Sequence, residues 1–265
     1  MTVRLGLALW AVTGCSFQGP AVSIATPDAP IVIVPDAAPP ARVRDQLIGL
    51  WTFDDAAGST RAADTSGTSM PVSLEVITSA TIAAPVFTSG TLVVDAPARL
   101  YSPESTHLTS DCIAAQAVTL EAWVLPKQET VVDPSFIGGL AANILSRDVA
   151  LLQVGNHWTA KVRTTGAADG TPDLVSTSTT STTHMTHLVV VADATQRLLY
   201  VDGVVEATGT PGPLLSWDPS FPMALVDEYQ HARQWLGTVA LVALYDRGLT
   251  SAEVKRNFLL GPNAP

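Results

Sequence analysis

Residues 198–206 read LLYVDGVVE, and this stretch decides the class of fold. An Asp-Gly pair separates two runs of β-forming residues, and such a pair favours a type I′ hairpin because both turn residues need a positive φ. Residues 188–192, LVVVA, come shortly before it and are continuously apolar, as expected for a strand that is buried on both faces. The sequence therefore predicts a β-hairpin that follows a buried strand.

The rest of the body has the same character. Further candidate strands are short, rich in β-branched residues and bounded by turn residues; they are 47–53, 118–124, 149–154, 158–163 and 235–245. The Thr- and Ser-rich residues 176–183 fit either an exposed edge strand or a long solvated loop.

A single helix is predicted, at the end of the chain. Thr250 can cap its first turn, Glu253 completes a capping box, and Gly261 can end it. Val254 and Phe258, four residues apart, would then face the strands. The expected fold class is all-β: a two-sheet antiparallel sandwich with one short C-terminal helix.

Composition excludes some classes of function. The chain has 265 residues, of which 47% are hydrophobic and 14% are charged, so it can bury a large core. Its net charge is −10 and its basic residues are scattered, which argues against nucleic acid as a partner. With two cysteines only, Cys112 is expected to be a buried hydrophobe, with a disulfide to Cys15 or a reactive thiol as alternatives.

The N-terminus is typical of an exported protein. Arg4 and the apolar residues 5–12 form the pattern of a signal peptide over 1–14. Residues 12–15, VTGC, look like a lipobox, which predicts that Cys15 is lipidated and anchors the chain to a membrane. The alternative is an ordinary signal peptide with an incidental cysteine. Because Ser16 rather than Asp follows the cysteine, we expect the outer membrane, with the domain facing the periplasm or the surface.

A tether separates this anchor from the folded domain. Six prolines between positions 20 and 40 prevent a helix and predict an extended spacer. The predicted organisation is a signal peptide (1–14), the lipidated cysteine with a Pro/Ala-rich tether (15–45), and a β-sandwich domain (46–265).

Four ordered segments of this domain resemble a known family. They are residues 51–58 with 64–67, residues 118–124, residues 187–193 with 199–203, and residues 237–245 with 249–253. Together they are similar to concanavalin A-like, laminin-G-like jelly-roll modules. In relatives, an aspartate of the closing strand and the opening-strand region can hold Ca²⁺. Here Ala240 stands in the closing strand, so Asp64 is at most a weak calcium candidate, and its alternative role is to accept backbone N–H bonds in a turn.

Catalytic machinery is not evident in the sequence. The fold also occurs in glycoside hydrolases, which need two carboxylates flanking the scissile bond, and the usual arrangement on one strand, Glu-x-Asp-x-x-Glu, is not present. Asp227 and Glu228 are adjacent, which would point them to opposite faces of a strand. His184 and His187 form no metal-ligand pattern, and His187 is expected to bond to the backbone. No cofactor is expected, and the chain is predicted not to be an enzyme.

Binding is the remaining class of function. Sugars stack on aromatic rings, and the candidate ligand-binding residues are Trp217, Trp158, Tyr229 and Trp235. The alternative is that the tryptophans belong to the core, which we expect for Trp51 and Trp123. The favoured hypothesis is a non-catalytic surface recognition module for a glycan or another polymer. The alternatives are a structural lipoprotein that binds surface proteins and, less favoured, a glycoside hydrolase.

Overall fold

The computed structural model describes residues 41–103, 106–230 and 233–263. The predicted signal peptide, the lipidation site Cys15 and nearly all of the predicted tether lie outside these residues. None of the helices in the described ranges is long and apolar enough to cross a bilayer.

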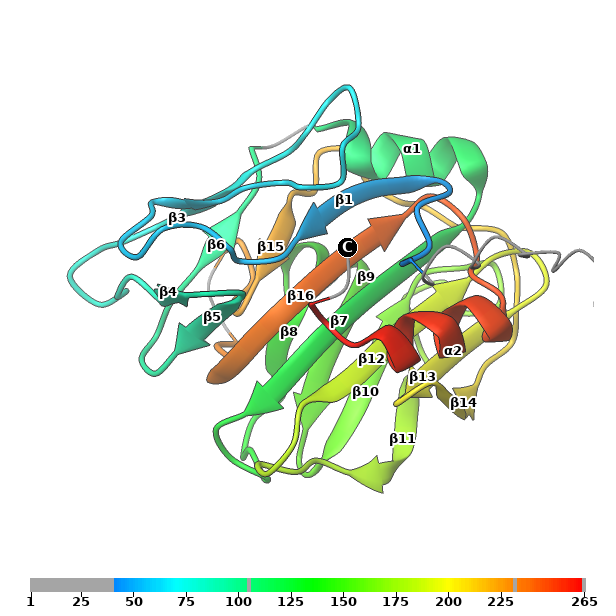
Figure 1. Cartoon of the computed structure of the whole chain (residues 1–265). Helices are drawn as coiled ribbons and strands as arrows, with labels where there is room; N and C mark the ends of the chain where they lie inside the picture. The colour runs from blue at the N-terminus through cyan, green and yellow to red at the C-terminus, as the bar shows by residue number, and fades with distance from the viewer. Residues whose placement is uncertain (1–40, 104–105, 231–232, 264–265) are drawn as a thin grey trace, which may run out of the picture. The chain divides into compact units, whose positions relative to one another are not determined.

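The described part of the chain folds into two antiparallel sheets (Figure 1). Sheet A has the order β14-β13-β12-β7-β16-β5-β4, and β1 also pairs with β16. Its strands are β1 (Leu47–Trp51), β4 (Val86–Thr88), β5 (Thr91–Val94), β7 (Val118–Pro126), β12 (Thr186–Ala192), β13 (Arg197–Val201), β14 (Val204–Thr208) and β16 (Gly237–Tyr245).

Sheet B has the order β11-β10-β9-β8-β15-β6-β3-β2. Its strands are β2 (Arg61–Ala62), β3 (Leu74–Val76), β6 (Leu100–Tyr101), β8 (Ser135–Asn143), β9 (Ser146–Val154), β10 (His157–Val162), β11 (Leu174–Thr179) and β15 (Met223–Leu225). The Thr- and Ser-rich residues adopt both of the predicted structures: 176–179 belong to the edge strand β11, and 180–185 form a loop.

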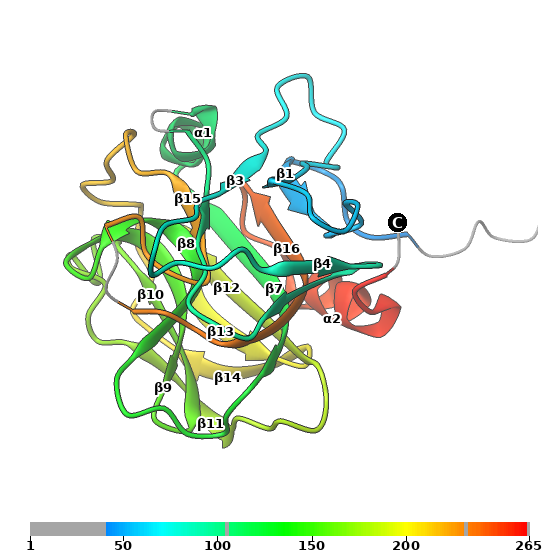
Figure 2. The same ribbon diagram turned by 90° about the vertical axis from the view of Figure 1, so that its left-hand side faces the viewer.

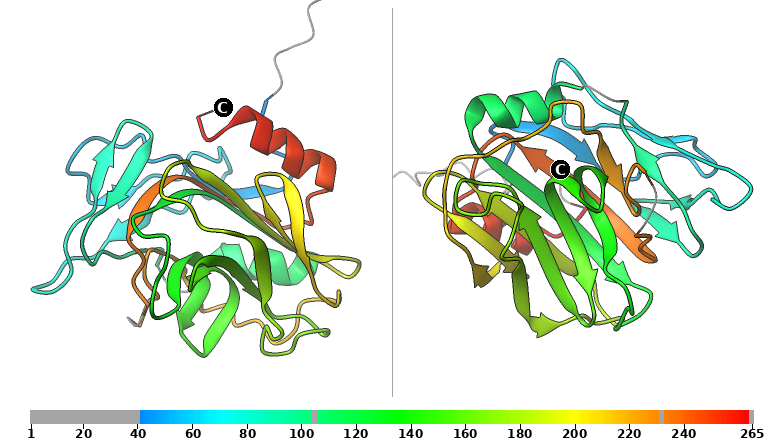
Figure 3. Two further views of the ribbon diagram at one scale, coloured as in Figure 1. Left: turned by 90° about the horizontal axis from the view of Figure 1, so that it is seen from below. Right: turned by 180° about the vertical axis from the view of Figure 1, so that it is seen from behind.

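The two sheets stack face to face, which confirms the predicted sandwich (Figure 2). The main core lies between them and includes Trp51 and Leu225, while the helix α2 (Ser251–Leu260) covers the outer face of sheet A (Figure 3). Trp123 lies beneath α2, where its ring stacks on Phe258 with 5.9 Å between ring centroids. Both tryptophans expected in the core, Trp51 and Trp123, are buried.

The predicted hairpin is confirmed. β13 and β14 are joined at Asp202 and Gly203, whose φ angles of 50° and 74° are those that a type I′ turn requires. The buried strand β12 pairs with β13 on one side and with β7 on the other. This places the continuously apolar residues at the centre of sheet A.

Helix α2 also forms as predicted, with Thr250 and Glu253 bonded reciprocally in a capping box. The expectation of a single helix is wrong, because residues His107–Ala115 form a second helix, α1. The N-cap of α1, Thr106, makes no side-chain capping bond, and Thr109 rather than Glu or Gln stands at the third helical position, so this helix has no capping box. Leu108 and Cys112 anchor α1 to the core, and the burial of Cys112 agrees with its predicted role.

A buried polar cluster joins the first described residues to sheet A and α2. Glu121 on β7 accepts hydrogen bonds from the Arg42 guanidinium, from His187 Nε2 at 2.9 Å and from Asn257 Nδ2 at 2.8 Å. Arg42 also donates to the carbonyl of Gly261 at 2.7 Å. Burial by itself would raise the pKa of Glu121, but the hydrogen bond and charge of His187 and the charge of Arg42 lower it to about 2. His187 therefore bonds to a side chain, which corrects the prediction of a backbone partner.

Candidate functional site

Three of the four predicted ligand-binding aromatics are core residues. Trp158 and Trp235 are each 1% exposed and Trp217 is 8% exposed, so none presents a ring face to solvent. The indole N–H of Trp217 donates to the carbonyl of Arg163 at 2.9 Å, which satisfies its polar atom inside the core. The prediction that Trp217 is exposed is wrong, because its ring packs into the main core and the next residue, Asp218, donates its backbone N–H to buried Asp148 at 3.0 Å.

Tyr229 is the half-buried member of the predicted set. It lies in the loop after β15, and its ring meets Tyr101 edge-on with 4.6 Å between centroids. Tyr101 is on β6, opposite Ala224 of β15. Tyr229 also lines a small pocket with Phe221 and Pro222, so it retains an accessible edge.

Asp64 accepts hydrogen bonds from backbone N–H groups around a turn, as its alternative role predicted. One carboxylate oxygen accepts from the backbone N–H groups of Leu50 at 3.1 Å and Ser66 at 2.8 Å, and the other accepts from Val72 at 2.9 Å. Three of its acceptor positions are therefore occupied by the backbone. The described residues contain no group of three or more His, Cys, Asp or Glu side chains that could hold a metal ion.

Asp227 and Glu228 do not behave as alternating strand residues. They lie in the loop between β15 and β16, so the prediction of opposite faces does not apply. Both are fully buried; Asp227 lies 3.5 Å from Arg99 Nε, and Glu228 accepts from Arg147 Nε at 2.5 Å. Burial raises the pKa of Glu228, and Arg147 opposes this effect. The two acids thus hold basic side chains beneath the loop.

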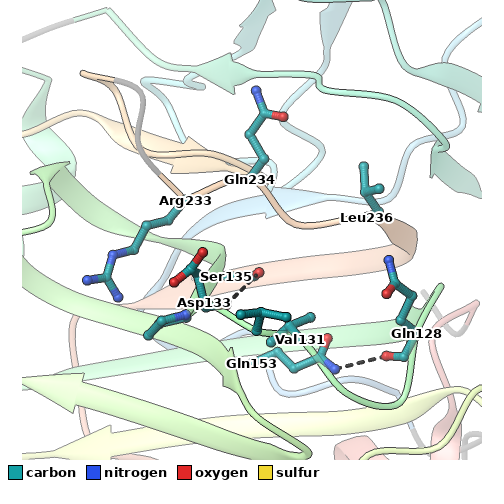
Figure 4. Close-up of a pocket in the computed structure, with 10 residues that line it drawn as sticks. Gln128, Val131, Asp133, Ser135, Gln153, Arg233, Gln234 and Leu236 are labelled. Atoms are coloured by element: carbon teal, nitrogen blue, oxygen red, sulfur yellow. Dashed lines mark hydrogen bonds between the residues drawn. The ribbon is translucent and has the colours of Figure 1, made fainter.

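A pocket of about 390 Å³ lies at one end of the sandwich, and we call it the end pocket (Figure 4). It is enclosed by the β7–β8 loop, by the segment that leads into β16, and by one residue of β9. Its lining residues are Gln128, Val131, Val132, Asp133, Pro134, Ser135, Gln153, Arg233, Gln234 and Leu236.

Backbone hydrogen bonds fix the walls of the end pocket. Lys127 N–H donates to the carbonyl of Leu236 at 3.0 Å, and Phe136 N–H donates to the carbonyl of Arg233 at 2.7 Å. Val131 N–H donates to the carbonyl of Gly155 at 3.0 Å. The two loops are therefore held to each other and to the β9–β10 turn, which gives the pocket a preformed shape.

The side-chain amide of Gln153 lies at the base of the end pocket, and its hydrogen bonds fix its orientation. Its side-chain amide donates to the carbonyls of Gln128 at 2.9 Å and Glu129 at 3.3 Å, and its oxygen accepts from Trp235 Nε1 at 3.0 Å (Figure 4 shows the first bond). The prediction that Trp235 contacts the ligand is therefore wrong. It acts from the core, where it orients the amide beneath the pocket.

Four polar side chains of the end pocket have no partner within the described residues: Gln128, Asp133, Arg233 and Gln234. Arg233 and Gln234 come from one wall and Gln128 and Asp133 from the facing loop (Figure 4). Val131 and Leu236 add apolar surface between them. Amide, carboxylate and guanidinium groups beside aliphatic side chains can bind the hydroxyls and the nonpolar face of a small polar ligand.

A family model described as the concanavalin A-like lectin/glucanase superfamily matches residues 103–255. The chain belongs to this superfamily. The match covers the region from α1 into α2, and it agrees with the jelly-roll fold that the ordered sequence segments predict. None of the curated proteins compared with the chain matches it.

Solved structures share the superfamily fold at low identity. A Trypanosoma rangeli sialidase in complex with sialic acid is 20% identical, with a TM-score of 0.59 over 82% of this chain and 33% of the sialidase. The same sialidase with a difluoro-KDN ligand gives 20% identity and a TM-score of 0.58, over 90% and 36% of the two chains. A botulinum neurotoxin type C structure is 9% identical, with a TM-score of 0.58 over 82% and 51%.

The chain therefore spans about a third of the length of the sialidases it matches and about half of the neurotoxin chain. At these identities the likeness establishes the fold alone. It nevertheless corrects the prediction that the chain is not an enzyme, because sialidases are among the proteins that contain this fold. The missing Glu-x-Asp-x-x-Glu segment is thus insufficient to exclude catalysis in this superfamily member.

Proposed function

We propose that this superfamily member binds carbohydrate in the end pocket. The observation that carries the proposal is the set of four unpartnered polar side chains around the fixed amide of Gln153. Gln128 and Asp133 are exposed and Arg233 and Gln234 are half-buried, so a ligand can reach their polar atoms, and sugar hydroxyls can donate to and accept from amides and carboxylates. Leu236 and Val131 provide apolar surface for the C–H groups of a sugar ring.

The similar structures support the same class of ligand. The sialidase was solved with sialic acid, and the neurotoxin study reports an interaction with two ganglioside molecules. Each of these proteins is longer than the matched part, so the activity of the whole protein is not carried over. What they support for this chain is carbohydrate as the ligand class.

The proposal includes the site of action. An exported chain that is anchored through Cys15 in the outer membrane would hold the sandwich away from the lipid on its proline-rich tether. Metabolic labelling with a fatty-acid analogue tests this part. We expect a label that Cys15→Ser abolishes, and an unlabelled wild-type chain would contradict the anchor.

A glycan array probed with the purified full-length chain tests the binding function. We expect binding to a restricted set of saccharides, and Gln234→Ala should reduce it by about tenfold, which corresponds to the loss of one or two hydrogen bonds. Gln46→Ala is the matched control, because Gln46 is exposed in the turn before β1 and lines no part of the end pocket. Absence of binding to every saccharide, or equal loss in both variants, would refute the proposal.

A further inference from the structure

Arg233 differs from most basic side chains of this protein. It is the only basic residue among the described residues that line the end pocket, and no carboxylate of the described part lies within ion-pair distance of its guanidinium. Other basic side chains in the described part are paired with acids; they are Arg42, Arg99, Lys127, Arg147, Lys161, Arg163 and Arg247. Arg44 also lines a pocket without an ion pair, but its guanidinium donates to the carbonyl of Ser66 at 3.2 Å.

The acids nearest to Arg233 in the chain are already engaged. Asp227 accepts from the backbone N–H groups of Glu228 at 2.9 Å and Arg233 at 3.1 Å, and its second oxygen faces Arg99. Glu228 is occupied by Arg147. These contacts fix the backbone of Arg233, while its guanidinium makes no hydrogen bond or ion pair within the described residues and interacts with Glu228 through charge alone.

Arg233 interacts with charges of both signs, because its positive charge lowers the pKa of Glu228 as well as that of Arg147. Burial lowers the pKa of Arg147, and the positive charge of Arg233 lowers it further despite the opposing effect of Glu228. Arg233 and Arg147 therefore repel each other and share the attraction of one carboxylate, that of Glu228. A negative group bound to Arg233 would offset this repulsion, and a planar carboxylate can accept two parallel N–H bonds from a guanidinium.

We propose that the end pocket selects saccharides that carry a carboxylate, such as sialic or uronic acids, and that Arg233 binds the carboxylate. This selectivity rests on the proposed carbohydrate binding in the same pocket. Gln128 and Gln234 then bind hydroxyls, and Leu236 contacts the nonpolar face of the ring. Asp133 lies in the same pocket and weakens the attraction for an acidic ligand.

Matched pairs of sugars test this selectivity. The affinity of the purified full-length chain is measured by titration calorimetry for lactose, sialyllactose and sulfated lactose, at one fixed ionic strength. We expect sialyllactose to bind at least tenfold more tightly than the other two. Arg233→Gln should reduce the affinity for sialyllactose to that for lactose. Asp133→Asn should increase the affinity for sialyllactose. The control Arg256→Gln removes an equal charge from the exposed face of α2 and should change neither affinity.

Each contrary result has a distinct meaning. Equal affinities for lactose and sialyllactose, or a preference that survives Arg233→Gln, would overturn the selectivity and leave carbohydrate binding intact. Sulfated lactose that binds as tightly as sialyllactose would overturn the preference for a carboxylate, because Arg233 would then respond to charge alone. If no sugar binds, even on a broad glycan array, the proposed function fails together with the selectivity. The neutral sugar therefore separates the two proposals.

Discussion

The buried pair of Arg42 and Glu121 gives the sharpest prediction about stability. Both side chains are fully buried, and Arg42 also bonds to the carbonyl of Gly261 beyond α2. The substitution Arg42→Met keeps most of the side-chain volume but removes the guanidinium. It would leave Glu121 buried without its cationic partner, a change that typically costs about 3–5 kcal/mol.

The structure places this variant at the lower end of that range. Glu121 retains the bonds from His187 and Asn257, so its charge is still partly compensated. We therefore expect a loss of about 3 kcal/mol, which shifts the midpoint of urea unfolding by about 1 M at an m value of about 2–3 kcal/mol/M. Arg44→Met is the control: Arg44 is exposed and donates one bond to Ser66, so its loss should cost less than about 1 kcal/mol.

The pH dependence of this difference tests its cause. The pKa of Glu121 is about 2 in the folded state, below its ordinary value of 4.5. A lowered folded-state pKa contributes stability that is full above pH 4.5 and is lost as the pH falls through 2. The advantage of the wild type over Arg42→Met should therefore shrink across that interval. A difference below about 1 kcal/mol at neutral pH, or one that does not change with pH, would refute the reasoning.

Three further predictions concern other parts of the domain. Burial raises the pKa of Asp148 from 3.8 to about 7, so the stability of Asp148→Asn relative to the wild type should rise with pH between these values, by at most about 4 kcal/mol. Denaturation at acidic and alkaline pH measures this gain, and a stability difference that does not depend on pH would contradict it. Thr250→Ala removes the side-chain cap of α2 and should cost about 1 kcal/mol in the same assay, whereas an unchanged midpoint would argue against the capping box. The Cys112 thiol is buried, and burial raises its pKa, so a thiol reagent should modify it only after unfolding; rapid modification of the native chain would disprove this.

Local chemistry made part of the fold predictable. The Asp-Gly pair of the β13–β14 hairpin and the Thr-Glu capping box of α2 each need only neighbouring residues, and both form as expected. Helix α1 was not predicted, because its start has no capping box and its attachment to the sandwich comes from the buried Leu108 and Cys112.

The candidate site depended on long-range packing and was not predicted. Gln128 and Arg233 come from loops about a hundred positions apart, and neither loop carries a motif. The sequence suggested aromatic stacking on exposed tryptophans. Trp158, Trp217 and Trp235 are buried instead, because burying their large apolar surface stabilises the fold. The alternation argument for Asp227 failed because the chain turns there instead of continuing as a strand.

The most direct test of carbohydrate binding in the end pocket is a crystal structure of the chain with the saccharide that binds best on the array. We predict density for the sugar between Gln128 and Gln234, in contact with Leu236 and above the amide of Gln153. Density for the sugar elsewhere, for example beside Tyr101 and Tyr229 on the outer face of sheet B, would contradict the assignment of the site.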